Sequence, residues 1–207
     1  MSTDCTENLP GQRGPVDHER REQILEVAEQ LFGAHGFRKT SVTDIGKAVG
    51  VSSAYIYRFF DSKQAIGEAV CAMCLAKIDV AIREVAERDA PATQRLRAML
   101  QCLLAQSLKV FLRERRLHDI IVAAIENEWQ VTEAHDRAIY EVIEKIVSDG
   151  RESGEFERKT PLDEVCTAIR STASVYAHPV LLKLTDPREK ERRLAAVTNL
   201  ILRSLAP

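Results

Sequence analysis

Residues 39–63 concentrate the side chains in this chain that could carry out chemistry. Hydroxyl, phenol and cationic groups recur there at short spacing, and such groups donate hydrogen bonds to phosphate oxygens and to base edges. Lys63 stands at an expected helix start, where backbone N–H groups also attract phosphate. The residues expected to meet a nucleic acid are Lys39, Thr43, Ser53, Ala54, Tyr55, Tyr57, Arg58 and Lys63. The chemistry indicated is binding rather than catalysis.

Two short helices are expected to position these side chains. Ser41 can cap the first helix, and Gly50 can end it in the left-handed conformation. Ser52 can cap the second helix. Their core-facing residues would be Val42, Ile45, Val49, Ile56, Phe59 and Phe60. Two short helices joined by a glycine-containing turn are typical of a helix-turn-helix, whose second helix reads the major groove. The alternative is a small helical subdomain with ordinary surface residues.

The distribution of charge favours a local binding surface. Lys+Arg 29 against Asp+Glu 31 gives a formal net charge of -2, which excludes a protein that coats nucleic acid through bulk charge. Residues 36–63, however, hold five basic and two acidic side chains, a surplus of three positive charges. A basic strip of this size suits docking through a small, shaped surface.

Catalytic and metal-binding sequence patterns are not found. The five histidines are not at metal-ligand spacing, and there is no nucleophile elbow or phosphate-binding glycine loop. Cys71 and Cys74 form one CxxC, without the second CxxC or histidine pair that zinc needs. We interpret these cysteines as helix packing, with redox sensing as the alternative. No enzyme activity, metal or cofactor is predicted.

The placement of glycine and proline predicts an all-α fold of about nine helices. Residues 68–149 contain no glycine, and Pro91 is their only proline, whereas strand-rich folds need turn residues every 8 to 12 positions or so. The hydrophobic fraction of 45% supplies a core. The last two helices are expected over 162–184 and 188–205, with Asp186 as a helix cap between them. Pro179 should kink the first of these helices or end its first half.

Three regions are expected along the chain. Residues 1–17 would be a flexible arm, 18–63 the helix-turn-helix domain, and 64–207 a larger helical domain. No apolar run reaches the roughly 18 residues that span a bilayer, and the N-terminus lacks a secretory signal. We therefore expect a cytoplasmic protein with reduced thiols and no membrane partner.

From Gln23 to Ala69, the sequence resembles the N-terminal domain of the TetR (tetracycline-repressor) family of bacterial transcriptional regulators. The resemblance rests on the ILEVAEQLFGAHGF helix, on the VTDIGKAVGVS helix and turn, and on the IYRFFDSK segment. Tyr55 departs from the small polar residue often found there, which leaves the base preference open. The resemblance implies a homodimeric repressor that a small effector releases from a near-palindromic, double-stranded DNA operator.

The resemblance also assigns effector binding and dimerisation to residues 64–207. Its last two helices would form a four-helix bundle with a second copy, through Val165, Ile169, Thr172, Ala173, Leu194, Val197, Ile201 and Leu205. Both helices also carry apolar residues outside a single stripe, as a helix needs when it packs on its own core and on a partner: Val175, Leu200 and Leu202. The alternative is a thicker core within a monomer.

A pocket for a mostly apolar effector would be lined by Met99, Leu103, Phe111, His118, Ile121, Trp129, His135 and Tyr176. Trp129 lies near an expected helix junction, where the favoured alternative is that it packs the corner between helices. A helical adaptor that binds only protein would explain the bundle, but not the placement of Thr43, Tyr57, Arg58 and Lys63.

Overall fold

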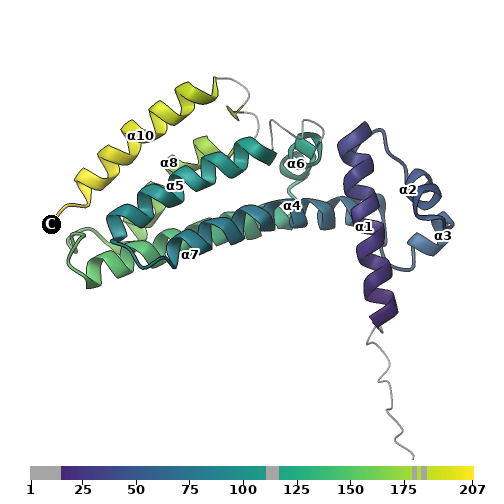
Figure 1. Cartoon of the computed structure of the whole chain (residues 1–207), viewed down its shortest axis with the longest axis horizontal. Coiled ribbons are helices and arrows are strands. Elements are labelled where there is room, and N and C mark those ends of the chain that lie inside the picture. The colour runs from purple at the N-terminus through teal and green to yellow at the C-terminus, as the bar shows by residue number, and fades with distance from the viewer. Residues whose placement is uncertain (1–14, 111–116, 179–180, 183–185) are drawn as a thin grey trace, which may run out of the picture.

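The computed structural model describes residues 15–110, 117–178, 181–182 and 186–207, and its regular elements there are all helices (Figure 1). They are α1 (Pro15–His35), α2 (Val42–Val49), α3 (Ser53–Ile56), α4 (Lys63–Ala86), α5 (Ala92–Leu108), α6 (Leu117–Glu126), α7 (Gln130–Glu152), α8 (Leu162–Ala177) and α10 (Pro187–Ser204). The all-α prediction is confirmed. Helix α1 begins inside the predicted arm 1–17, of which residues 1–14 lie outside the described part.

The helices form two groups that α4 connects. Figure 1 shows α1, α2 and α3 gathered at one end of the molecule, while α5, α7, α8 and α10 lie together at the other. Helix α4 begins beside the first group and runs along the second, where it packs on α5 and α7. The short helix α6 contacts α1 and α4 at the junction. The group of α1, α2 and α3, called the N-terminal unit below, is therefore connected directly to a long helix of the larger domain.

Serine caps define the starts of three helices in and beside the first group. The Ser41 side chain accepts the Asp44 N–H and its backbone N–H donates to the Asp44 carboxylate, which is a capping box. The Ser52 side chain accepts the Tyr55 N–H at the start of α3, and the Ser62 side chain accepts the Ala65 N–H at the start of α4. Gly50 ends α2 with φ 81°, a left-handed conformation that glycine adopts without strain. The caps and the stop predicted for the helix-turn-helix are confirmed.

Apolar side chains fill one continuous core through both groups. Phe32, Ile45 and Ile56 are fully buried and hold α1, α2 and α3 together. In the larger domain, Leu96 of α5 and Ile146 of α7 are fully buried as well. Burying each such side chain contributes about 1.5–3 kcal/mol, so the core is sufficient to fix the position of α3.

Helix α8 ends just before Pro179, where the sequence predicts a kink or the end of the first half of a longer helix. It ends at Ala177 rather than near residue 184, and His178 is extended with ψ 122°. His178 precedes Pro179, whose ring disfavours the helical conformation in the residue before it. The predicted break before the last helix is confirmed, since the Asp186 side chain accepts the Arg188 N–H at 2.9 Å and α10 begins at Pro187. The consequence is that His178 leaves the helical path of α8.

Candidate nucleic-acid interface and ligand cavity

A close backbone approach sets the angle between α2 and α3. The Gly46 carbonyl accepts hydrogen bonds from the Gly50 and Val51 N–H groups, each at 2.9 Å. A Cβ atom on Gly46 would lie 2.8 Å from the Val51 carbonyl oxygen, which is backbone and cannot rotate away. Only glycine therefore allows the turn to fold back on α2 and present α3.

Replacing Gly46 with alanine is expected to destabilise the chain by about 1–3 kcal/mol, the usual cost of forcing atoms into a filled space. Gly33→Ala is the matched control, because Gly33 also lies in a helix and a Cβ there would meet nothing within 4 Å. That control should be neutral or stabilising by up to about 1 kcal/mol. Thermal unfolding of both variants measures the difference, and equal melting temperatures would contradict the role given to Gly46.

The predicted recognition residues gather on the outer side of α3. Tyr57 is 50% exposed, and Ala54 and Arg58 are also exposed, whereas Ser53 and Tyr55 are half-buried. The Arg58 guanidinium lies over the Tyr55 ring, 5.2 Å from its centroid. This stacking holds a cation beside the exposed end of the helix, where a phosphate or a base edge could meet it.

Two predicted residues outside α3 frame the same surface. Thr43, in the first turn of α2, is exposed, and its hydroxyl lies 3.2 Å from the Ser53 hydroxyl. Lys39 is exposed in the segment before α2. The structure therefore joins the N-terminal ends of α2 and α3 through a side-chain hydrogen bond and leaves the Lys39 ammonium facing solvent.

Lys63 has structural contacts that the sequence did not indicate. Its ammonium donates to the Arg38 carbonyl oxygen at 3.2 Å and lies 4.7 Å from the centroid of the Phe37 ring. Partial burial lowers the pKa of the Lys63 ammonium. Lys63 thus links the start of α4 to the segment after α1, in addition to its predicted contact with DNA.

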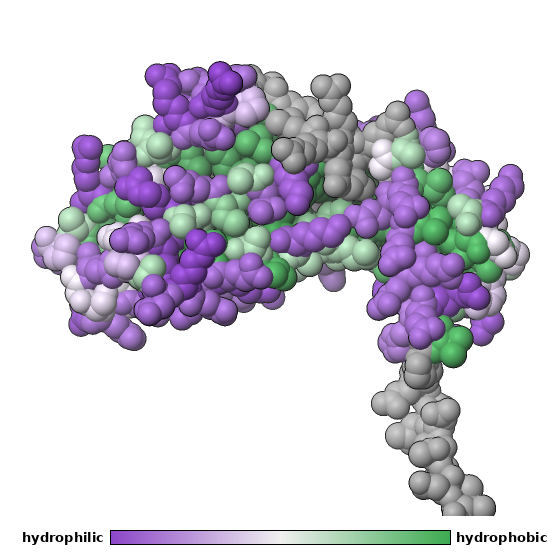
Figure 2. All heavy atoms as spheres, viewed as in Figure 1, coloured by the Kyte–Doolittle hydropathy of each residue, from purple (hydrophilic) through white to green (hydrophobic). Residues whose placement is uncertain are grey.

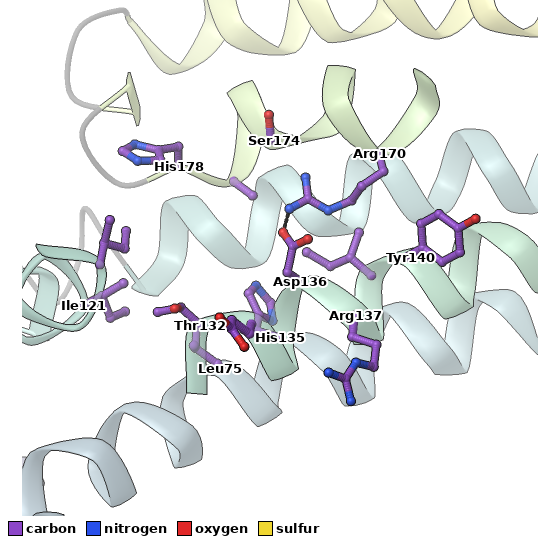
Figure 3. A pocket seen from close by; sticks show the side chains of 14 residues that line it. Leu75, Ile121, Thr132, His135, Asp136, Arg137, Tyr140, Arg170, Ser174 and His178 are labelled. Atoms are coloured by element: carbon purple, nitrogen blue, oxygen red, sulfur yellow. Dashed lines mark ion pairs between the residues drawn. The ribbon is translucent and has the colours of Figure 1, made fainter. Parts of the chain in front are cut away.

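A cavity of about 580 Å³ opens among α4, α6, α7 and α8 (Figure 3). Leu75, Ile121, Ile125 and Ile139 supply apolar wall from three of these helices. Drug-sized ligands occupy mostly apolar cavities of about 300–1,000 Å³ with a few polar groups. Both the size and the lining of this cavity suit a small organic molecule.

The predicted pocket residues are distributed over several places. Ile121 and His135 line the cavity. Met99 and Leu103 are buried within the core, and Tyr176 is buried on α8, without lining this cavity. Phe111 and the side chain of His118 lie outside the described residues. The centre of the cavity is therefore displaced from α5 toward α6 and the first half of α7.

Polar residues also line the cavity, and three of them, Asp136, Arg170 and His178, were not predicted from the sequence. Arg170 pairs with Asp136 across α7 and α8, and His178 closes one end (Figure 3). His135 lies 2.6 Å from the Asp79 carboxylate, measured from Nδ1 to Oδ1. The available signal was Arg170 itself, a cation beside the apolar stripe of its helix, one residue after the buried Ile169.

Trp129 lies at the junction of the two groups of helices rather than in the cavity wall. It is buried, and its ring meets Phe37 edge-on with centroids 5.6 Å apart. Both rings pack over Gly67 of α4, where a Cβ would lie within 3.0 Å of each. Trp129 therefore packs the residues just before α7 against Phe37, in the segment after α1, and against the start of α4.

Helix α6 contacts both the cavity and the N-terminal unit. Its Ile121 and Ile125 line the cavity, while Glu126 forms a 2.9 Å salt bridge with Arg38. The two partners of this salt bridge are largely exposed, so its stabilising energy is small. The position of the salt bridge is more informative than its energy. A shift of α6 would change its contact with Arg38, which lies in the segment between α1 and α2.

The residues predicted for pairing of two copies differ in exposure. Val165, Ile169, Ala173, Leu194 and Leu205 are buried within the protomer, and Thr172, Val197 and Ile201 are half-buried. The large exposed apolar side chains of these two helices are Val175, at 49%, and Leu200, at 67%. In contrast to these exposed apolar residues, hydrophilic side chains cover α1 and the start of α10 (Figure 2).

The cysteines of the CxxC are sheltered from solvent. Cys71, Cys74 and Cys166 are buried and unbonded to one another, and Cys102 is half-buried. Burial raises the pKa of the Cys71 thiol to about 12 and that of Cys166 to about 11. Because the thiolate is the reactive form, these thiols are poorly suited to redox sensing.

A thiol reagent is expected to modify Cys71 in the native chain at least 100-fold more slowly than in the guanidinium-unfolded chain. A raised pKa of this size lowers the thiolate fraction about a thousandfold at neutral pH. Mass spectrometry of the modified peptides measures the rates, with Cys102 as the internal reference. Rapid formation of a Cys71–Cys74 disulfide in peroxide would instead support the redox alternative.

Two further properties of the described residues bear on other functions. Among them, no three or more His, Cys, Asp or Glu side chains form a group that could hold a metal ion. None of the described helices has the length and apolar character needed to cross a membrane.

Two segments match known protein families. Residues 24–70 match the family described as bacterial regulatory proteins, tetR family, and residues 92–198 match the tetracyclin repressor-like C-terminal domain. The chain is 39% identical over 51 residues to the HTH-type transcriptional repressor KstR2 of Rhodococcus jostii (strain RHA1). That match spans 25% of this chain and 25% of the relative, so the chain aligns with a quarter of that protein's length.

Two solved structures share the fold over most of their length. The TetR family transcriptional regulator PfmR from Thermus thermophilus is 26% identical, with a TM-score of 0.59, over 90% of this chain and 97% of that one. The transcriptional regulator FadR from Bacillus subtilis, solved in complex with stearoyl-CoA, is 19% identical, with a TM-score of 0.61, over 89% and 97%.

Proposed function

The chain belongs to the tetR family of bacterial regulatory proteins, and from that premise we propose that it is a repressor released from its operator by a small, mostly apolar effector. The observation that carries the proposal is helix α6, which lines the 580 Å³ cavity with Ile121 and Ile125 and contacts the N-terminal unit through Glu126. The binding of stearoyl-CoA by the similar FadR protein supports a ligand-dependent role.

We propose that α3 enters the major groove of the operator. Ser53, Ala54 and Tyr55 would meet base edges at the N-terminal end of α3, as in other helix-turn-helix proteins. Tyr57, Arg58, Thr43, Lys39 and Lys63 would contact the sugar–phosphate backbone and fix the register. The exposure of Tyr57, Arg58 and Lys39 supports these roles, because a residue that meets DNA must be reachable from solvent.

We propose a homodimer that pairs the exposed faces of α8 and α10. The five predicted interface residues that are buried already fill the protomer core, so the pairing surface moves to Val175 and Leu200. The exposed Ala168, Ser171 and Ala196 beside them are small, which allows helices of two copies to approach closely. A twofold dimer of this kind would place two α3 helices about 34 Å apart, in successive major grooves.

Release would follow from a shift between two dimer conformations. An effector in the cavity that favours one position of α6 would favour the matching position of the segment between α1 and α2. Reversing a 99:1 preference to 1:99 requires about 5.5 kcal/mol of differential binding between the two conformations. No catalytic residue is needed for such a function.

The test is selection of bound DNA from a random pool by the full chain. The proposal expects enrichment of a near-palindrome whose half-sites are one helical turn apart or a multiple of it. Enrichment of an asymmetric sequence, or no enrichment, would contradict the proposed docking of two α3 helices.

A further inference from the structure

Two polar atoms in the cavity wall lack a hydrogen-bond partner among the described residues. They are Nε of Arg170 and Nδ1 of His178, and both atoms are buried. A buried donor or acceptor without a partner destabilises the protein, so a ligand that supplies the partner would be bound more tightly. The two atoms therefore mark where a ligand would place its polar groups.

The formal charges of the wall are already balanced. Arg170 forms an ion pair with Asp136. His135 is hydrogen-bonded to the Asp79 carboxylate, which is not among the residues that line the cavity. At the exposed mouth, Glu133 and Arg137 add one charge of each sign, one helical turn apart. A ligand carboxylate would face Asp136, and an ammonium group would face Arg170, so neither sign of ligand charge is compensated.

Arg170 and Ser174 lie on one face of α8, and His178 directly follows the last residue of that helix. Arg170, Ser174 and His178 follow each other at intervals of four residues, and Figure 3 shows Ser174 between the other two along the cavity. Eight residues of helix correspond to about 12 Å along the axis. Apolar wall from Leu75, Ile121 and Ile139 faces this stretch.

We propose that the cavity binds an uncharged, elongated, mainly apolar molecule with an oxygen group at each end. A hydroxyl or carbonyl oxygen at one end accepts from Arg170 Nε–H, and a hydroxyl at the other bonds to His178 Nδ1. This proposal rests on the proposed function, because it names the chemical class of the effector.

The test measures binding of four ten-carbon probes to the full chain by titration calorimetry. Decane-1,10-diol is expected to bind about threefold to tenfold more tightly than decan-1-ol, the usual gain from one additional hydrogen bond. Decanoate and decylammonium are each expected to bind at least tenfold more weakly than decan-1-ol. Tighter binding of either charged probe, or no binding of the diol at millimolar concentration, would overturn the proposal.

Conservative variants locate the two contacts. Arg170→Lys keeps a cation beside Asp136 and removes the Nε–H group, and His178→Phe keeps a ring and removes Nδ1. Each should reduce the advantage of the diol over decan-1-ol to less than twofold. Arg137→Lys, at the exposed mouth, is the matched control and should keep the full advantage. An advantage that persists in both cavity variants would overturn the placement of the oxygen groups.

The same diol separates this proposal from the proposed function. Operator affinity is measured with and without saturating diol. If the diol binds with the expected preferences and operator affinity does not change, the ligand class stands and release by this cavity is wrong. If operator affinity falls only with decanoate, the cavity regulates DNA binding and the uncharged ligand class is wrong.

Discussion

Replacing Lys39 and Arg58 together with alanine is expected to lower operator affinity on the order of 1,000-fold in 0.1 M salt. Both side chains are exposed beside α3, and a dimer of the variant loses four cations that would contact phosphate. Each such contact contributes about 0.9 to the slope of log affinity against log salt, so the slope should decrease by about 3.6. Fluorescence anisotropy with the selected operator at several salt concentrations measures both quantities.

The control for this variant is Arg83→Ala with Arg88→Ala. These two arginines are exposed near the end of α4 that lies away from the N-terminal unit. Replacing both of them removes the same amount of positive charge as replacing Lys39 and Arg58. The control should keep the operator affinity within about threefold and the salt slope within about one unit, since long-range charge effects are screened beyond about 10 Å in 0.1 M salt. Equal losses in both double variants would show that net charge, and not the surface around α3, determines DNA binding.

The second large effect is expected at the pairing surface of α8 and α10. Replacing Val175 and Leu200 with glutamate should raise the dimer Kd at least 100-fold, or about 2.8 kcal/mol. In a twofold interface the same patch of each copy meets its equivalent, so the new carboxylates would be buried close to one another. Sedimentation equilibrium measures the Kd, and operator affinity should fall with it because a monomer presents one α3 helix.

Val80→Glu is the matched control for the dimer variant. Val80 lies on α4 and is 52% exposed, close to the 49% of Val175, but it is outside the proposed pairing surface. This control should remain dimeric with unchanged operator affinity. If the variant with both Val175→Glu and Leu200→Glu keeps a dimer Kd within threefold of that of the parent chain, the dimer interface lies elsewhere.

The N-terminal unit could be predicted closely because its signals are local. Ser41 and Asp44 are three residues apart in the capping box, and Gly50 ends α2 immediately after its last turn. The apolar spacing of Ile45 and Ile56 follows from helical periodicity, and both side chains are fully buried. Interactions within a few residues of each other can be read from a single sequence.

The cavity was harder to predict because its wall depends on contacts between distant segments. Asp79 and His135 are 56 residues apart and meet only after α4 and α7 have packed. Trp129 was a candidate for the pocket, with packing at a corner between helices as the favoured alternative, and it packs on Phe37 and Gly67. An apolar periodicity shows that a face is buried, but it does not show what that face packs against.

The same limit applies to the pairing helices. The apolar stripe that includes Ile169 and Leu194 was assigned to the contact between two copies, yet these side chains are buried in one copy. A stripe that fills the protomer core and a stripe that faces a partner have the same period of 3.6 residues. The sequence set Val175 and Leu200 apart from a single apolar stripe, and the packing shows that both side chains are exposed.

The most direct test of operator binding by a twofold dimer is the affinity for an operator with five base pairs inserted between its half-sites. Five base pairs rotate one half-site by about half a helical turn relative to the other, so two α3 helices cannot reach both major grooves at once. The expected result is a loss of affinity of at least 100-fold. Affinity within twofold of the parent operator would contradict the docking of a rigid dimer through two α3 helices.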